Sequence, residues 1–145
     1  MSAISYIRLC ISGGVDINSF AIPKIVFQKM FDDENWDVMR LYVKDEASDQ
    51  LKLVSVIFSY KSGLTYAHML VGLDYRFLHS HKTYKQSLYR AVQRGKSLGC
   101  TNIYLGFTAH REKRKVGAKG IDTVAYIQAK DHFSADFIEN MSLSK

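Results

Sequence analysis

The stretch Tyr66–Ala67–His68–Met69–Leu70–Val71–Gly72–Leu73, with the residues that follow it as far as Ala118, decides the fold of this chain. The stretch is typical of a strand, and it leads through a polar loop to an amphipathic helix expected at 82–99. A second strand is expected at 101–107 and a short basic helix at 109–116. Because a helix-length crossover joins the two strands, they must lie parallel. Ligands of such units tend to bind where strand ends meet helix starts, so we expect a functional site at those positions.

The helix at 82–99 is the most strongly patterned segment of the chain. Its apolar residues recur at helical spacing, Thr83 stands near its start, and Gly99 marks its end. The residues of this stripe are Tyr84, Leu88, Ala91, Val92, Gly95 and Leu98.

The flanking segments complete one α/β (α+β) domain. Upstream we expect a strand at 5–11, a helix at 16–31 and three antiparallel strands at 36–44, 51–60 and 64–73. Downstream a last strand is expected at 122–130. A length of 145 residues and a hydrophobic share of 47% fit a single domain with one core.

Charge and cysteines narrow the class of protein. Lys and Arg outnumber Asp and Glu by 20 to 14, which favours anionic partners, and most of the surplus follows residue 76. Cys10 and Cys100 form no metal-ligand spacing and are expected to be free thiols. Neither a signal sequence nor a bilayer-length apolar run occurs, so we expect a cytoplasmic protein that does not cross a membrane.

The predicted order β-α-β-β-β-α-β-α-β is similar to that of the GNAT superfamily, the acyl-CoA N-acyltransferase fold. Asp74–Tyr75–Arg76 resembles the end of the fourth GNAT strand, 87–99 resembles its third helix, and 112–118 resembles the short helix ending in Gly and a hydrophobic residue. In that fold the parallel pair splays apart in a mostly antiparallel sheet with flanking helices. The likeness spans roughly residues 5–130.

A narrower resemblance is to the acyltransferase branch that contains the FemAB-like enzymes. There a strand of the form Ile–Tyr–Leu–Gly–Phe, here 103–107, precedes Ser or Thr and a helix that bears Lys and ends in Gly–Ala. Lys113 or Lys115 and then Gly117–Ala118 occupy those places. Similar domains occur attached to larger acyl-CoA-using or aminotransferase-like enzymes, so the single domain 1–145 is also compatible with being part of a longer polypeptide.

The resemblance implies a site for acetyl-CoA or another acyl-CoA as co-substrate, with a small-molecule or peptide amine as acceptor. A homodimer is compatible with it, and no metal is required. The acyl thioester is expected in the gap between the splayed strands, and Lys113 is expected near the cofactor. The loop expected around the CoA pyrophosphate comprises Leu78, His79, Ser80, His81, Lys82 and Thr83.

Two departures from the family pattern bear on that expectation. The loop at 76–83 contains no Gly, whereas GNAT enzymes bind the pyrophosphate on backbone N–H groups of a Gly-rich loop. Either the loop takes a wider path with side-chain donors, or CoA is not bound. The Tyr that protonates the leaving thiolate in many GNAT enzymes would fall near Lys113. Both departures favour an alternative, a catalytically degenerate GNAT-like domain that serves as a binding or assembly module.

Three residues are candidates for the base that deprotonates an acceptor amine: Asp74, His68 and His79. The alternatives are a cap or salt bridge with Arg76 for Asp74, a core or sheet-face histidine for His68, and a solvated loop for His79. His79 and His81 are also compatible with an anion contact, or with a metal site that lacks a convincing third ligand.

The basic run 111–115 has three interpretations: a solvated helix face, a contact to the 3′-phosphate of CoA, or a nucleic-acid interface. Nucleic-acid binding ranks last because no stacking aromatic residues are interleaved with the run.

Overall fold

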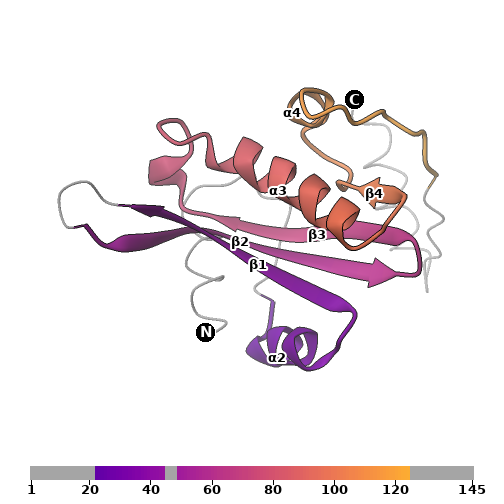
Figure 1. The fold of residues 1–145 in the computed structure, drawn as a ribbon, viewed down its shortest axis with the longest axis horizontal. Coiled ribbons are helices and arrows are strands. Elements are labelled where there is room, and N and C mark those ends of the chain that lie inside the picture. The colour runs from indigo at the N-terminus through magenta and orange to yellow at the C-terminus, as the bar shows by residue number, and fades with distance from the viewer. Residues whose placement is uncertain (1–21, 45–48, 125–145) are drawn as a thin grey trace, which may run out of the picture.

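The computed structural model describes residues 22–44 and 49–124 (Figure 1). The strand expected at 5–11, the first part of the helix expected at 16–31 and nearly all of the strand expected at 122–130 lie outside these residues, as does Cys10. The described elements, in chain order, are α2 (Lys24–Asp32), β1 (Trp36–Lys44), β2 (Leu51–Ser62), β3 (Thr65–Leu73), the 3-10 turn η1 (Tyr75–Phe77), α3 (Thr83–Ser97), β4 (Asn102–Tyr104) and α4 (His110–Arg114).

The four described strands form one mixed sheet in the order β1-β2-β3-β4. The pairs β1/β2 and β2/β3 are antiparallel, which confirms the three antiparallel strands, and Gly63 with φ +54° lies in the tight turn between β2 and β3. The pair β3/β4 is parallel, as the crossover through α3 requires. The fold is therefore of the mixed α+β type.

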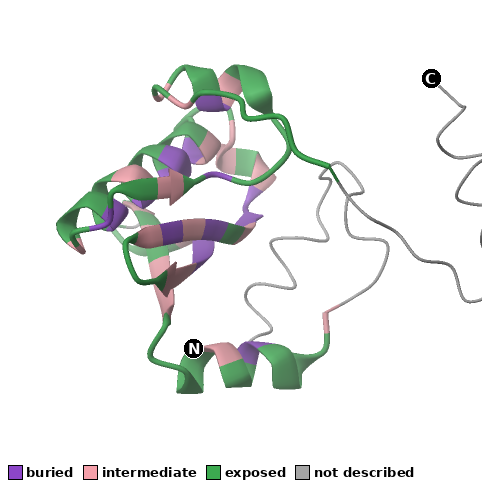
Figure 2. Ribbon diagram, turned by 90° about the vertical axis from the view of Figure 1, so that its right-hand side faces the viewer, coloured by how far each residue is buried: buried purple, intermediate pink, exposed green. Residues whose placement is uncertain are grey.

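Helices cover both faces of the sheet, as Figure 1 shows with α2 on one side and α3 on the other. Phe27 of α2 packs with Val56 and Phe58 of β2 in one core cluster. Tyr66, Leu88 and Ala91 belong to the cluster on the α3 side. Because it lies between these layers, β2 is buried continuously from Val54 to Ser59, in keeping with the purple band on the sheet in Figure 2.

Helix α3 matches its sequence stripe and packs closely on the sheet. A Cβ atom at Gly95 would lie 3.1 Å from side-chain atoms of Ile103 and Tyr66, so a larger residue would require these side chains to shift by a few tenths of an ångström. The helix ends with Gly99 at φ +74°, and the Cys100 N–H donates to the Gly95 carbonyl at 3.0 Å. Cys100 is a buried free thiol, as expected.

A three-way contact fixes α3 against the sheet. Asp37 of β1 accepts hydrogen bonds from Arg94 Nε at 2.9 Å, Arg94 Nη2 at 3.1 Å and Tyr66 Oη at 2.7 Å. Burial acts to raise the pKa of Asp37, but the hydrogen bonds from Arg94 and Tyr66 outweigh it and leave this pKa below its ordinary value. The contact therefore links β1, β3 and α3 at one end of the sheet.

The second parallel strand is shorter than predicted. It was expected at 101–107, but β4 covers only Asn102–Tyr104, and Gly106, two residues further on, adopts φ +80°, which is not a strand conformation. The basic helix expected at 109–116 is α4, His110–Arg114. Within the described residues β4 is an edge strand, and 122–124, the part of the last predicted strand that is described, are not in a strand.

Candidate functional site

The pairing of the parallel strands β3 and β4 ends beside an irregularity in β3. Their pairing covers only Thr65 to Ala67, opposite Asn102 to Tyr104, whereas β3 continues to Leu73. On its other side, β3 pairs through His68 with Ser59 and through Leu70 with Phe58, so Met69 is an extra residue, a β-bulge. Bulges redirect side chains and occur often beside functional sites. His68 therefore directly follows the last residue of β3 that pairs with β4.

His68 is buried and chemically unusual. The residue is only 6% exposed, and its Nδ1 atom has no hydrogen-bond partner in the part of the chain that is described. Burial lowers the pKa of His68 to about 4, and the charge of Lys113 contributes to the shift. The imidazole is therefore neutral near pH 7, with one nitrogen that donates and one that accepts.

Lys113 reaches the same place from α4. It is 7% exposed, and no hydrogen bond or ion pair to its ammonium occurs among residues 22–44 and 49–124. Burial lowers its pKa. A Cβ atom at the exposed Gly106 would lie 3.6 Å from Lys113 Nζ and 3.7 Å from the His68 carbonyl oxygen. We call the group of His68, Gly106 and Lys113 the splay site.

Helix α4 connects the splay site to the start of α3. Glu112, the neighbour of Lys113, forms an ion pair with Lys115 at 2.5 Å. Burial raises the pKa of Tyr84 in the first turn of α3, and the charge of Glu112 adds to this effect. Helix α4 therefore lies near the first turn of α3 as well as near Gly106 and the His68 backbone, and Figure 1 shows it on the α3 side of the sheet.

Asp74 ends β3 and caps the 3-10 turn η1. Its carboxylate accepts from Arg76 N–H at 3.1 Å, from Arg76 Nε at 3.0 Å and from Arg76 Nη2 at 2.6 Å. Hydrogen bonds from the Arg76 side chain hold the pKa of Asp74 below its ordinary value, against the opposing effect of burial. The cap and the salt bridge considered from the sequence both form, and they make Asp74 a weaker base.

The glycine-free loop takes up a conformation that glycine would favour. Lys82, directly before α3, has φ +51°, in the left-handed region where a side chain is costly. No side chain caps the N-terminus of α3, and the Oγ1 of Thr83, a residue only 2% exposed, has no partner among the described residues. The first backbone N–H groups of a helix have no acceptor inside the helix. The helix start thus offers several unused donors.

The other loop candidates are more exposed. His79, Ser80 and His81 are exposed, Leu78 is half-buried, and the Ser80 hydroxyl lies 2.9 Å from His81 Nδ1. The His81 ring packs against Phe77 at 5.4 Å between centroids. These contacts involve His81 and not His79, so they do not bring the two imidazoles together around one ligand.

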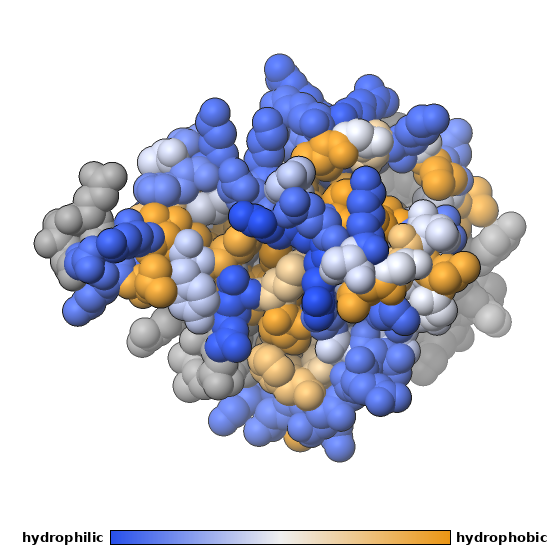
Figure 3. Space-filling view, in the orientation of Figure 1, coloured by the Kyte–Doolittle hydropathy of each residue, from blue (hydrophilic) through white to orange (hydrophobic). Residues whose placement is uncertain are grey.

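The basic residues of the run 111–115 differ in their exposure to solvent. Arg111, Arg114 and Lys115 are exposed and line a shallow hollow together with His110, Gly120, Ile121 and Asp122. In the space-filling view, hydrophilic side chains surround apolar groups at the centre of the face (Figure 3). Only Lys113 of this run is buried.

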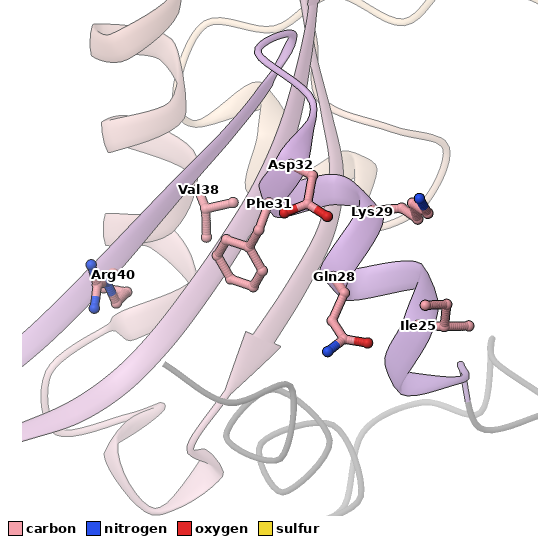
Figure 4. Close-up of a pocket in the computed structure, with 7 residues that line it drawn as sticks. All are labelled: Ile25, Gln28, Lys29, Phe31, Asp32, Val38 and Arg40. Carbon is pink, nitrogen blue, oxygen red and sulfur yellow. The ribbon is translucent and has the colours of Figure 1, made fainter.

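A second hollow lies on the opposite side of the sheet, between α2 and β1 (Figure 4). Its charged groups Lys29, Asp32 and Arg40 are exposed. Phe31 lies between the helix and the strand. Because its charged groups are solvated and converge on no point, we assign this hollow no chemistry.

The described residues show neither a metal cluster nor a membrane-spanning helix. Within residues 22–44 and 49–124, no group of three or more His, Cys, Asp or Glu residues is placed to hold a metal ion. None of the described helices has the length and apolar character needed to cross a membrane. Comparisons of the chain with protein-family models, with curated proteins and with solved structures gave no match.

The sequence predicted some members of the site and missed others. His68 and Lys113 were candidates with separate roles, and the fold brings them together. The bulge at Met69 and the part played by Gly106 were not predicted as site features. Gly106 gave a usable signal, because a glycine that directly follows a strand pattern often marks a turn or a close backbone approach.

Proposed function

We propose that this chain is an acyl-CoA-dependent N-acyltransferase with a GNAT-like fold, which transfers an acetyl or other acyl group to an amine. One observation carries the proposal: the pairing of the parallel strands β3 and β4 stops after three residue pairs, beside a bulge and two buried polar side chains. We place an opening for the ligand there, where β3 continues beyond its last pair with β4.

The chemistry would take place in that opening. The acceptor amine attacks the thioester carbonyl, the C–N bond forms, the C–S bond breaks, and CoA leaves as a thiolate. A backbone N–H near Met69 would donate to the developing oxyanion. Positioning of the two substrates, rather than a covalent enzyme intermediate, would provide most of the rate.

His68 is the best of the three candidate bases. Its Nδ1 has no partner among the described residues, it is neutral near pH 7, and it lies at the opening. Asp74 is bound to Arg76 and would act through a water molecule, and His79 is exposed on the loop. A neutral imidazole accepts the amine proton without a prior ionisation step.

The start of α3 is the proposed site for the CoA pyrophosphate. Its backbone N–H groups, the unpartnered Thr83 hydroxyl and the ammonium of Lys82 are donors suited to an anion. The positive φ of Lys82 supports this assignment, because the loop adopts a backbone conformation typical of glycine although no glycine is present. The exposed Arg111 and Arg114 are candidates for the 3′-phosphate.

Thermal unfolding with acetyl-CoA, with CoA alone and with a long-chain acyl-CoA tests the proposal. Saturation at about 100 times Kd should add roughly 2.7 kcal/mol, which raises Tm by several degrees in a domain of this size. Thr83→Val removes the hydroxyl and keeps the volume, and Lys82→Gly removes the charge and keeps the backbone conformation. Both should weaken binding, whereas Ser97→Ala at the other end of α3 should not.

The second candidate is a GNAT-like domain that binds or assembles without catalysis. The glycine-free loop and the engagement of Asp74 by Arg76 favour it. A domain of this kind would release no CoA from acetyl-CoA in the presence of a pool of amines. If no CoA compound raises Tm, the acyltransferase proposal fails and this candidate replaces it.

A further inference from the structure

We propose that the splay site binds the carboxylate group of a free amino acid, which makes an amino acid the acceptor of the acyl group. The assignment of the amino acid as acceptor rests on the proposed acyltransferase function, whereas the carboxylate site itself rests only on His68, Gly106 and Lys113.

The first argument is the charge of Lys113. Lys113 is 7% exposed as a residue, and its ammonium has no carboxylate or carbonyl acceptor among the described residues, so a bound anion would stabilise the charge. The ion pairs of the described residues join other groups, and Lys115 rather than Lys113 pairs with the adjacent Glu112. A bound anion would supply the missing partner.

The second argument is the imidazole of His68. Its Nδ1 is buried without a partner in the described part of the chain, and the ring carries one N–H. The charge of Lys113 acts on this ring, and an ammonium together with one N–H matches the two oxygens of a carboxylate. A dianionic phosphate would place a second charge against a single cation, so the site fits a carboxylate better.

The third argument is that Gly106 lies close to both Lys113 and the backbone of His68. The point where a Cβ atom would lie is 3.6 Å from Lys113 Nζ and 3.7 Å from the His68 carbonyl oxygen. The position is exposed, so a small ligand reaches it from solvent. The carbonyl oxygen suits an ammonium while Lys113 suits a carboxylate, and an amino acid carries both groups two bonds apart.

The test is a titration of the protein without any acyl-CoA. Each of the twenty standard amino acids is added in turn, and binding is followed by the NMR signals of the His68 ring and by calorimetry. The tightest binder is then compared with its carboxamide, which keeps the amine and lacks the carboxylate. A saturable change of the His68 signals with the amino acid, and none with the amide, is the expected result.

Variants assign the contact to one side chain. Lys113→Met keeps the apolar stem and removes the charge, so affinity for the amino acid should fall roughly tenfold or more. Lys119→Met, an exposed position on the same basic segment, should bind like the wild type. The wild-type His68 signals report on the site even if Lys113→Met does not fold.

Three results would overturn the inference: no amino acid binds, the amide binds as well as its parent, or folded Lys113→Met binds like the wild type. None of these results depends on CoA binding. If acetyl-CoA raises Tm in a Thr83-dependent way and no amino acid binds, the proposed function stands and the carboxylate site does not.

Discussion

Replacement of His68 by Gln should change how the stability of the protein depends on pH. In the folded protein, burial and the charge of Lys113 lower the pKa of His68 from its ordinary value of 6.5 to about 4. The unfolded chain therefore takes up a proton first as the pH falls. The stability that comes from a neutral His68 is fully present above pH 6.5 and is lost as the pH falls through about 4.

The size of the effect follows from these two pKa values. Between pH 7.5 and 5, the wild type should lose about 2 kcal/mol more of its free energy of unfolding than His68→Gln does. Urea unfolding of both proteins across this range measures the difference, because other titrating groups contribute equally to both. His110→Gln, at an exposed position, controls for the loss of an imidazole.

Two results would refute the reasoning about His68. One is the same pH dependence in the wild type and His68→Gln, and the other is a His68 ring that titrates near 6.5 by NMR. Lys113→Met offers a further check. Because burial is the larger cause of the shift, this variant should raise the pKa of His68 but leave it below 6.5.

Three other substitutions test the packing, with urea unfolding as the measurement in each case. Gly95→Ala should destabilise the protein by up to about 2 kcal/mol, because overpacking at 3.1 Å outweighs the better helix propensity of Ala. Gly120→Ala is the control, because open space surrounds that position, and it should not destabilise the protein. Equal losses of stability in the two variants would count against the argument. Tyr66→Phe should cost about 1 kcal/mol through the lost hydrogen bond to Asp37, and an unchanged stability would mean that this bond is dispensable. Phe27→Ala should cost about 3–5 kcal/mol, and a loss below about 1 kcal/mol would show that α2 adds little to the core.

The regular elements were predictable because their patterns are local. The apolar stripe of α3 is largely buried, as its spacing indicates, alternation located β1, and strand-type residues after a turn signal located β3. The parallel direction of β4 followed from the crossover alone. In each case the decisive information lies within one segment or in the length of one connection.

The site was less predictable because it depends on distant pairings. The bulge at Met69 arises from the register between β2 and β3, which no single segment specifies. Lys113 belongs to a basic run typical of a solvated helix face, and only the packing of α4 shows that it is the buried member. The strand pattern at 101–107 continued through Gly106, whose positive φ ends the strand early.

The crossover between β3 and β4 also has a consequence for the order of folding. Strands β1, β2 and β3 follow one another through short connections, so their contacts close small loops and can form early. The pairing of Thr65 with Asn102 requires closure of the long segment that contains α3. Since His68 lies near the start of this segment and Lys113 lies beyond its end, the two halves of the splay site come together only at that closure. We therefore expect the site to be assembled last as the chain folds and to open first under native conditions, with amide hydrogens of β4 exchanging sooner than those of β2.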